Sequence, residues 1–236
     1  MKEWEIEYHV KQMDHPYRST EKFVDWLEEM GFLGRGEQII DMACGAGANT
    51  MYMANRFQKD QFTGVDYNGE YIDYGNTQIT ERVRYHNCKL LQGDWFDLNI
   101  NQKPDGIISF QALSWFSEYE KPLTALAELN PGWIAASSLF YEGDIDYSIK
   151  LKNYYRGAEN SYEESYYNIY SLPRVQKHLK ELGYGNFKFI RFEIDIDLPK
   201  PDTKDLGTYT IKTEDGKRLQ ISGGLMMPWY FVVAYK

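Results

Sequence analysis

The feature that most constrains the fold is the stretch IIDMACGAGANT at residues 39–50. A short apolar run ends in an acid, two glycines follow one residue apart, and a helix-forming segment then begins. Glycine adopts backbone angles that other residues avoid and lets a ligand approach the chain closely, while the first turn of a helix offers free backbone N–H groups. The stretch therefore predicts a strand, a loop and a helix that together form a nucleotide site.

The spacing of the glycines disagrees with two common kinds of nucleotide site. The dinucleotide fingerprint has a third glycine that lets helix and strand pack closely, whereas here Gly45 and Gly47 are followed by Thr50. A P-loop requires a Gly-Lys-Ser/Thr sequence, which this loop lacks. A Gly-x-Gly pair alone is weak evidence for any one kind of nucleotide, so the kind has to be inferred from the rest of the chain.

Strands and helices alternate on both sides of this loop. Short apolar runs predict strands, and apolar residues at helical spacing predict helices. Strands that are apolar along their whole length are typical of a parallel sheet covered by helices on both faces, so we expect an α/β fold. The expected strands are 37–42, 61–66, 88–94, 105–110 and 133–141, and the expected helices are 21–30, 48–57, 69–80 and 120–129.

After residue 141 the pattern changes, and residues 142–170 are acidic and rich in tyrosine. We interpret this insert as a substrate cap, with an ordinary packed helical cap as the alternative. No linker divides the chain, so we expect one domain over 1–236 with an N-terminal arm at 1–18. The tyrosines of the insert are Tyr147, Tyr154, Tyr155, Tyr162, Tyr166, Tyr167 and Tyr170. Beyond the insert, the expected elements are a helix over 171–182, a strand over 187–198, a hairpin over 208–221 and a strand over 226–236.

Three aspartates fall at or near the carboxyl ends of successive strands: Asp41, Asp66 and Asp94. Because these ends form the ligand crevice of open α/β sheets, we expect the three carboxylates to line one crevice. A carboxylate at the position of Asp66 can accept both hydroxyls of a ribose. Such a crevice needs no pyrophosphate to explain it, and it fits a cationic nucleoside better than a dinucleotide.

Four segments resemble, in order and with suitable spacing, the motifs of class I S-adenosylmethionine-dependent methyltransferases of the small-molecule type. They are IIDMACGAGANT, FTGVDYN, LLQGDWFDL and DGIISFQALSWF. The resemblance covers about residues 35–141, and the last helix and strands also fit. It implies a Rossmann-like, seven-stranded, mostly parallel sheet with helices on both faces and a reversed C-terminal edge strand. It also implies S-adenosyl-L-methionine as cofactor and S-adenosyl-L-homocysteine as product.

The same resemblance implies which residues contact the cofactor. Asp66 would hold the ribose hydroxyls, Asp94 would accept from the adenine amino group, and Asp41 would orient the loop or meet the methionine amino group through water. The backbone of the glycine loop would pack against the methionine and the ribose. The implied cofactor-binding residues are Tyr17, Asp41, Ala43, Gly45, Gly47, Asp66, Tyr67, Asp94, Trp95, Phe110 and Gln111.

Methyl transfer from a sulfonium is an in-line displacement, so the protein mainly aligns the reactants and excludes water. An oxygen acceptor needs a base, whereas an amine needs only to arrive unprotonated. His15 and Tyr141 are the predicted catalytic residues, and His9 is expected to lie in the arm without a partner. The acceptor is expected to be framed by segments outside the nucleotide motifs, with Trp115, Glu142, Tyr154 and Trp229 as the predicted substrate-binding residues.

We therefore predict a cytoplasmic methyltransferase that acts on a small molecule, on oxygen ahead of nitrogen. Nitrogen methylation, an NAD-linked Rossmann oxidoreductase and a protein that binds the cofactor without catalysis remain alternatives. The net charge of −9 disfavours nucleic acid as a partner, and with it an RNA methyltransferase, because a phosphate backbone attracts clustered Lys and Arg. A membrane is not expected either, since no apolar run reaches the roughly 18 residues of a span and the polar N-terminus does not resemble a signal peptide.

No metal is predicted. Cys44 and Cys88 lack metal-ligand spacing and are expected to be reduced thiols, which favours the cytoplasm. The acids Glu142, Asp144 and Asp146 could suggest a metal site, but their spacing is common by chance and does not indicate one. We expect a monomer or a homodimer whose only other partner is its small-molecule substrate.

Overall fold

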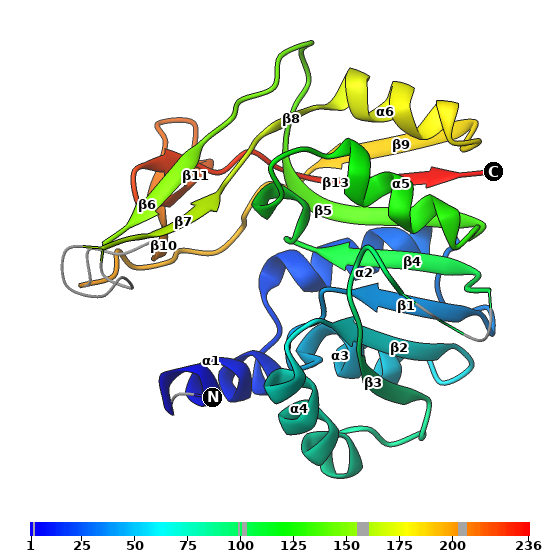
Figure 1. Ribbon diagram of the computed structural model, residues 1–236. Coiled ribbons are helices and arrows are strands. Elements are labelled where there is room, and N and C mark those ends of the chain that lie inside the picture. Colours follow the sequence, from blue (N-terminus) through cyan, green and yellow to red (C-terminus); the bar gives the residue numbers. More distant parts are fainter. Residues whose placement is uncertain (2, 99, 101–102, 155–160, 203–206) are drawn as a thin grey trace.

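The computed structural model describes residues 1, 3–98, 100, 103–154, 161–202 and 207–236. Its centre is a mixed sheet in the order β3-β2-β1-β4-β5-β13-β9, with the short β8 paired to β5 beside this path (Figure 1). The five strands from β1 to β5 run parallel to one another. The predicted α/β fold with a mostly parallel sheet is confirmed.

Most of the helices and strands follow the apolar pattern of the sequence, while α1 and β8 are not among the expected elements. The strands of the sheet are β1 (Gln38–Met42), β2 (Gln61–Asp66), β3 (Cys88–Gln92), β4 (Gly106–Phe110), β5 (Trp133–Tyr141), β8 (Tyr170–Ser171), β9 (Asn186–Arg191) and β13 (Trp229–Tyr235). The helices are α1 (Glu3–Asp14), α2 (Arg18–Glu29), α3 (Ala48–Arg56), α4 (Gly69–Arg82), α5 (Glu120–Glu128), α6 (Leu172–Glu181) and the 3₁₀ turn η1 (Leu113–Trp115).

Two hydrophobic clusters lie on the two faces of the sheet. Neighbouring residues of a strand point to opposite faces, so Ile39 and Ile40 of β1 belong to different clusters. Ile39 packs in the cluster that contains Phe23 of α2, together with side chains of α3 and α4. Ile40 packs in the cluster that contains Leu123 of α5, together with side chains of α6. Both faces of the inner strands are therefore buried, which is why these strands read as apolar runs.

The predicted reversed strand is β13, which is antiparallel to both β5 and β9. It lies between them, so β9 rather than β13 forms the edge of the sheet. The reversal has a simple cause: Trp229 pairs with Leu139, near the carboxyl end of β5, so the chain enters β13 at that end and runs back.

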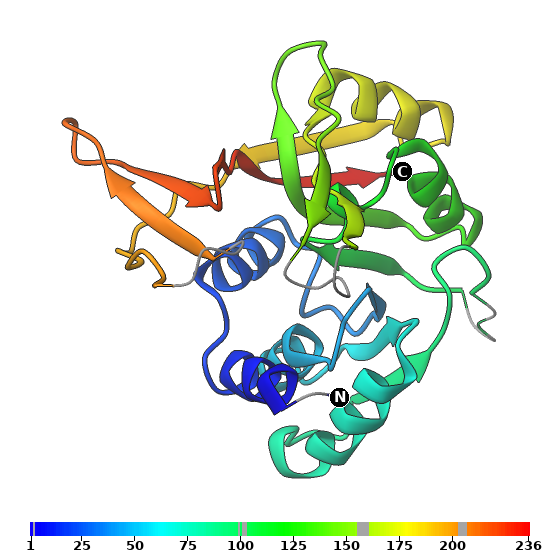
Figure 2. The same ribbon diagram turned by 60° about the vertical axis from the view of Figure 1, so that its left-hand side comes forward.

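The segment predicted as an N-terminal arm forms a helix, α1. Val10 and Met13 of this helix are partly buried, and Met13 packs against the cluster on the α2 face. Figures 1 and 2 show α1 on the side of the sheet towards which β1 and β4 point. The arm thus lies against the carboxyl edge of the sheet, where the site is expected.

Two further β structures lie on the same side of the sheet (Figure 1). The insert contains an antiparallel hairpin, β6 (Lys150–Asn153) with β7 (Glu163–Tyr166), so the helical alternative for it is wrong; Tyr155 lies outside the described residues. Between β9 and β13 the chain forms a small sheet of β10 (Thr208–Lys212), β11 (Arg218–Ser222) and β12 (Leu225–Met226). Its predicted turn is confirmed, with Gly216 at φ +81°. Within the described ranges, no helix is both long and apolar enough to cross a membrane.

Candidate functional site

The loop after β1 has a backbone that only a few residues adopt. Ala43, Gly45 and Gly47 have φ values of +60°, +57° and +82°. Ala43 is not a glycine, and non-glycine residues in this region are strained and cluster at functional sites. At Gly47 a Cβ would lie 2.7 Å from two methyl carbons of Leu90. The positive φ and the close approach of Leu90 behind the loop therefore favour glycine here.

Helix α4 packs directly on this loop. A Cβ at Gly75 would lie 2.4 Å from the carbonyl oxygen of Ala46 and 2.4 Å from a methyl carbon of Leu90. Glycine inside a helix lowers helix stability, and its presence is explained by this close approach. The loop is thus held between α4 and the sheet.

The acids at the ends of β1 and β2 make different contacts with the loop region. The Asp66 carboxylate accepts hydrogen bonds from the N–H groups of Gly45 and Asn68, each at 2.9 Å. The side chain of Asp41 is buried, and its Oδ2 accepts from the Thr50 hydroxyl at 2.6 Å. Oδ1 of Asp41 is buried and has no hydrogen-bond partner among the described residues. Burial raises the pKa of Asp41 to about 7, with a smaller contribution from repulsion by Asp66.

The residues after β3 divide between surface and core. Asp94 is exposed and accepts from the N–H of Phe96 at 2.8 Å. Trp95 is buried, and its indole N–H donates to the carbonyl of Pro122 in α5 at 2.9 Å. Tyr67, after β2, is 78% exposed. Asp94 and Tyr67 are therefore exposed after their strands, whereas Trp95, which is expected beside the adenine, points into the core.

A second strained residue follows β4, the strand beside β1. Gln111 has φ +59°, and its N–H donates to the carbonyl of Ser137 at 2.8 Å. Its side-chain amide donates to the hydroxyl of Ser19 at 3.0 Å. The Phe110 ring packs edge-on against Phe23 of α2, with ring centroids 5.4 Å apart. Strained backbone thus occurs at the carboxyl ends of two adjacent strands, and the start of α2 is tied to one of them.

The structure packs a histidine of α1 against the glycine loop. This histidine is His9 rather than His15. His9 is 6% exposed, and a Cβ built on Gly45 would lie 3.4 Å from its Cε1 atom. Its ring is 4.7 Å from that of Tyr71 in α4. His9 therefore packs against the loop and α4 rather than lying free in an arm. The helical spacing of Ile6, Val10 and Met13 is the signal that could have placed it on a docked helix.

His15 and Tyr17 connect α1 to α2. His15 is exposed. Tyr17 is partly exposed, with its ring 6.4 Å from that of Tyr8, and burial raises the pKa of its hydroxyl. Because Tyr17 lies two residues before Ser19, this junction is close to the carboxyl end of β4.

The predicted acceptor residues lie in different environments. Trp115 is half-exposed and packs against Tyr167, with ring centroids 4.8 Å apart. Tyr141 packs edge-on against Tyr147, and Tyr154 packs against Tyr162.

Glu142 and Trp229 complete this set. Glu142 accepts from the hydroxyl of Tyr230 at 2.7 Å. Trp229 is buried in the core, and its indole N–H has no partner in the described part of the chain. Trp229 is therefore part of the core, whereas Trp115, Tyr141 and Tyr154 are exposed.

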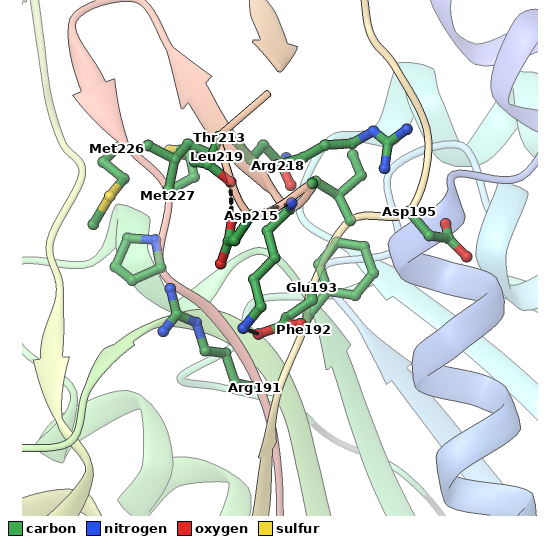
Figure 3. A pocket seen from close by; sticks show the side chains of 15 residues that line it. Arg191, Phe192, Glu193, Asp195, Thr213, Asp215, Arg218, Leu219, Met226 and Met227 are labelled. Atoms are coloured by element: carbon green, nitrogen blue, oxygen red, sulfur yellow. Dashed lines mark hydrogen bonds and ion pairs between the residues drawn. The ribbon is translucent and has the colours of Figure 1, made fainter. Parts of the chain in front are cut away.

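A cavity of about 430 Å³ lies between the chain that leaves β9 and the β10–β11 hairpin (Figure 3). Phe192, Leu219 and Met227 supply apolar walls, and Arg191 and Lys217 supply positive charge. Lys217 pairs with Glu193 at 3.6 Å. The volume is in the range of small-molecule pockets, although the glycine loop does not line it.

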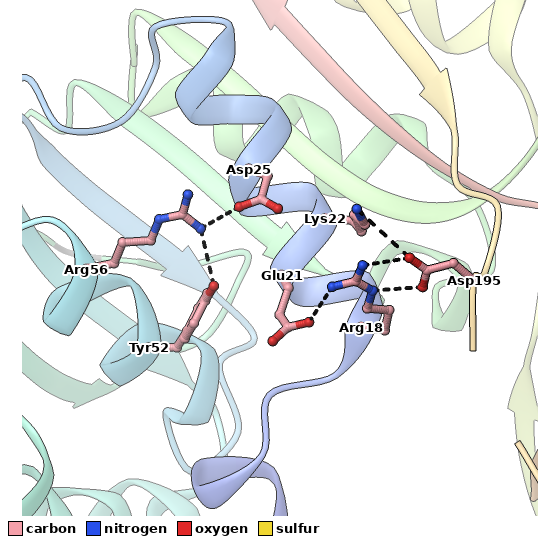
Figure 4. A network of polar contacts seen from close by, with 7 residues as sticks. All are labelled: Arg18, Glu21, Lys22, Asp25, Tyr52, Arg56 and Asp195. Atoms are coloured by element: carbon pink, nitrogen blue, oxygen red, sulfur yellow. Dashed lines mark hydrogen bonds and ion pairs between the residues drawn. The ribbon is translucent and has the colours of Figure 1, made fainter. Parts of the chain in front are cut away.

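A polar network fixes α2 between α3 and the segment that follows β9 (Figure 4). Arg18 donates to both carboxylate oxygens of Asp195, at 2.8 and 2.6 Å, and to Glu21 at 3.0 Å. On the other side, Arg56 of α3 donates to Asp25 of α2 at 2.6 Å. Exposed ion pairs add little stability individually, but a bidentate arginine fixes geometry. The network links the cavity wall at Asp195 to the helix that contacts Gln111.

Among the described residues, no three His, Cys, Asp or Glu side chains gather in a group that could hold a metal ion. Cys44 and Cys88 are free thiols. Burial raises the pKa of Cys44 well above its usual range and that of Cys88 to about 12, so both thiols stay protonated.

Comparison with known proteins agrees with this geometry. Residues 39–130 match a family model described as a methyltransferase domain. The (S)-coclaurine N-methyltransferase of Papaver somniferum is 25% identical over 150 residues, which is 64% of this chain and 40% of that protein. The malonyl-[acyl-carrier protein] O-methyltransferase of Priestia megaterium is 24% identical over 169 residues, or 69% of this chain and 60% of that protein.

The chain therefore spans less than two thirds of the length of these two curated relatives. A solved S-adenosylmethionine-dependent methyltransferase from Clostridium acetobutylicum has the same fold, with a TM-score of 0.57, 14% identity and 98% coverage of both chains. Residues 39–130 thus match a methyltransferase domain, and the whole chain has the fold of a solved S-adenosylmethionine-dependent methyltransferase.

Proposed function

We propose that the chain binds S-adenosylmethionine at the carboxyl edge of β1, β2 and β4 and transfers its methyl group to a small-molecule acceptor. One observation supports this most strongly: the buried Asp41 has an unpartnered Oδ1 beside a strained glycine loop. A buried carboxylate oxygen without a partner is costly. The ammonium of the methionine, directly or through water, supplies the cation that this oxygen lacks.

The neighbouring residues fit the rest of the cofactor. Asp66 already orients the loop through Gly45 and, as a carboxylate, has lone pairs left for the ribose hydroxyls. Tyr67 and Asp94 form an exposed surface for adenine. Gln111, tied to Ser19 of α2, faces the methionine end. When bound, the cofactor supplies an activated methyl group, and these side chains bind and orient it.

The acceptor is proposed to bind between α1, η1, the insert and the β10–β12 sheet. Trp115 and Tyr141 offer exposed aromatic surface there, and tyrosine suits small organic ligands because it joins an apolar ring to a polar tip. The cavity beside Arg191 adds space on the same side. The net charge of −9 supports a small acceptor over nucleic acid, and the two free thiols support the reducing cytoplasm.

Oxygen is the acceptor atom that we place first, with nitrogen as the alternative. The two curated relatives divide on this point, since one is named an N-methyltransferase and the other an O-methyltransferase. An oxygen acceptor requires a base, and His15 and Tyr141 remain the predicted ones. If His15 is the base, the rate of His15→Ala should fall roughly 10²-fold with cofactor affinity intact. A turnover within about threefold of wild type would remove His15 and direct attention to Tyr141 and Glu142.

Calorimetric titration with S-adenosylmethionine, S-adenosylhomocysteine and NAD tests the cofactor. Micromolar binding of the two sulfur ligands without binding of NAD supports the proposal, and the reverse preference indicates an oxidoreductase. Turnover of phenols, carboxylic acids and amines then tests the acceptor. Cofactor binding with no methyl transfer across such a panel would favour a protein that binds the cofactor without catalysis.

A further inference from the structure

His9 is a buried polar residue of α1 that packs against the glycine loop. None of the roles assigned above explains its burial. It projects from α1, 6% exposed, against the backbone of Gly45. Its ring is 4.7 Å from that of Tyr71 and 5.2 Å from that of Tyr8. Asp66, which accepts from the N–H of Gly45, is near enough to act on the charge of His9.

The position of His9 is fixed because α1 is attached to α4 along its length. The hydroxyl of Tyr71 donates to Glu5 at 3.1 Å. Arg82, at the end of α4, pairs with Asp14 at 2.6 Å, and the amino group of Met1 pairs with Glu70 at its start. His9 thus lies midway along a helix held at both ends, and its contact with the loop follows from that docking.

The Nδ1 atom of His9 is buried and has no hydrogen-bond partner among the residues the structure describes. A buried polar atom left unpaired costs about 1–3 kcal/mol, so native proteins seldom keep one without a use for it. Burial also lowers the pKa of His9, while Glu5 and Asp66 oppose this effect. A neutral imidazole offers either a donor or an acceptor at Nδ1, according to its tautomer.

We propose that His9 is a cofactor-binding residue whose Nδ1 forms a hydrogen bond with a ribose hydroxyl, beside the Asp66 carboxylate. This assignment rests on the proposed function, because it requires a nucleoside at the glycine loop. A hydroxyl both donates and accepts, so one ribose hydroxyl satisfies Nδ1 in either tautomer. The other ribose hydroxyl can still donate to Asp66. Helix α1 then forms one wall of the cofactor site, and the residues that dock it help set cofactor affinity.

Three variants separate the hydrogen bond from the packing of the ring. His9→Phe keeps a ring against Gly45 and Tyr71 but removes Nδ1. His9→Asn retains a polar atom at the Nδ1 position, and His9→Gln places one at the Nε2 position instead. Calorimetric titration with S-adenosylhomocysteine should show about fivefold or greater loss of affinity in His9→Phe, partial recovery in His9→Asn, and none in His9→Gln. Glu7→Gln, on the exposed side of the same helix, is the matched control and should bind like wild type.

Analogues of S-adenosylhomocysteine that lack the 2′- or the 3′-hydroxyl identify the contact. Removal of the hydroxyl that His9 binds should weaken wild type by about fivefold more than it weakens His9→Phe, because the variant has already lost that bond. Equal losses in both proteins for both analogues would overturn the ribose contact. If wild type binds S-adenosylhomocysteine and His9→Phe binds it equally or more tightly, the assignment of His9 is wrong while the proposed function stands. If wild type does not bind S-adenosylhomocysteine at all, both the assignment of His9 and the proposed function are wrong.

Discussion

Asp41 and Asp66 show how two residues of one type, on neighbouring strands, acquire different tasks from their surroundings. Asp66 lies at the edge of the sheet, where its carboxylate accepts from the N–H of Gly45 in the loop and from the N–H of Asn68 before α4. Asp41 lies behind the loop, where burial raises its pKa to about 7. The first carboxylate is suited to hydroxyl donors and the second to a cation that compensates for its burial.

We predict that Asp66→Ala weakens the binding of S-adenosylhomocysteine at least about tenfold, because the ribose loses a charged acceptor and the N–H of Gly45 loses its partner. Calorimetry measures the dissociation constant. Asp73→Ala, an exposed acid of α4, is the control and should leave affinity unchanged. Equal affinity of Asp66→Ala and wild type would remove Asp66 from the ribose.

The ligand-free protein should lose stability as pH rises from about 4 to about 7. In this range the folded state keeps Asp41 protonated, with a pKa of about 7, while the unfolded chain ionises it near the ordinary value of 3.8. The unfolded state therefore binds fewer protons, and the free energy of unfolding falls as pH rises. Other groups titrate as well, so the contribution of Asp41 is isolated by Asp41→Asn.

Urea unfolding of wild type and Asp41→Asn at pH of about 4 and about 8 gives the difference between their free energies of unfolding at each pH. From the lower to the higher pH, this difference should shift in favour of Asp41→Asn by on the order of 1–3 kcal/mol. Asparagine can still accept from Thr50, which makes the comparison close to isosteric. A difference in unfolding free energy that is the same at both pH values would contradict the buried, protonated Asp41.

At this scale, the motifs on the strand ends place Asp41 and Asp66 correctly, because strand direction alone brings those ends to one edge. They do not reveal that Trp95 turns into the core towards Pro122, since local sequence does not specify side-chain direction after a strand ends. They also do not reveal His9, whose burial depends on a docked helix distant in sequence from the loop.

Among the elements, α4 illustrates a conflict between helix propensity and packing. Alanine is a better helix former than glycine by about 1 kcal/mol, yet a Cβ at Gly75 would lie 2.4 Å from a backbone oxygen of the glycine loop. Packing decides in favour of glycine, because a backbone atom of the loop cannot move without shifting the site.

We predict that Gly75→Ala lowers the free energy of unfolding by more than about 1 kcal/mol, despite the gain in helix propensity, and weakens S-adenosylhomocysteine binding. Chemical denaturation and calorimetry measure the two effects. Gly185→Ala is the matched control, because no atom lies within 4 Å of a Cβ there. A Gly75→Ala protein as stable as wild type, with normal affinity, would mean that α4 does not constrain the loop.

Helix α1 should become better protected when the cofactor binds. Its attachment relies largely on partly exposed contacts such as Glu5 with Tyr71 and Asp14 with Arg82, which open more readily than the core strands. Hydrogen exchange should slow in α1 on adding S-adenosylhomocysteine, with little change in β1 and β4. The substrate-cap insert should slow further when acceptor is added. Equal exchange of α1 with and without ligand would show that it is a fixed part of the fold.

The elements differ in how well sequence alone predicts them. The helices and the inner strands of the central sheet are buried on a defined face, so their apolar periodicity is strong and their positions are predicted closely. The edge strand expected over 187–198 is mostly exposed and ends at Arg191 as β9. The β6–β7 hairpin, with sequences such as KLKN and EESY, is exposed along much of its length and carries no such pattern. The N-terminal helix has a short apolar face that is broken by exposed Ile6.

In the whole molecule, the carboxyl edge of the sheet is the place where distant segments meet. Helix α1, the start of α2, the β6–β7 hairpin and the β10–β12 sheet all lie on that side (Figure 2), and Arg18 ties two of these regions together through Asp195. The order of motifs predicts the topology, because strand order follows from short right-handed connections. The placement of α1 and the two inserts depends on long-range packing that no local pattern contains.

The central claim is that this edge performs methyl transfer, and the formation of S-adenosylhomocysteine measures it most directly. Purified protein is incubated with S-adenosylmethionine and a panel of small phenols, carboxylic acids and amines, and S-adenosylhomocysteine and the methylated acceptor are quantified by mass spectrometry. We expect one equivalent of S-adenosylhomocysteine for each methylated product with at least one acceptor class, and strongly reduced formation in Asp66→Ala at the same cofactor concentration. Formation that never exceeds the protein-free background, or that is unaffected by Asp66→Ala, would contradict the claim.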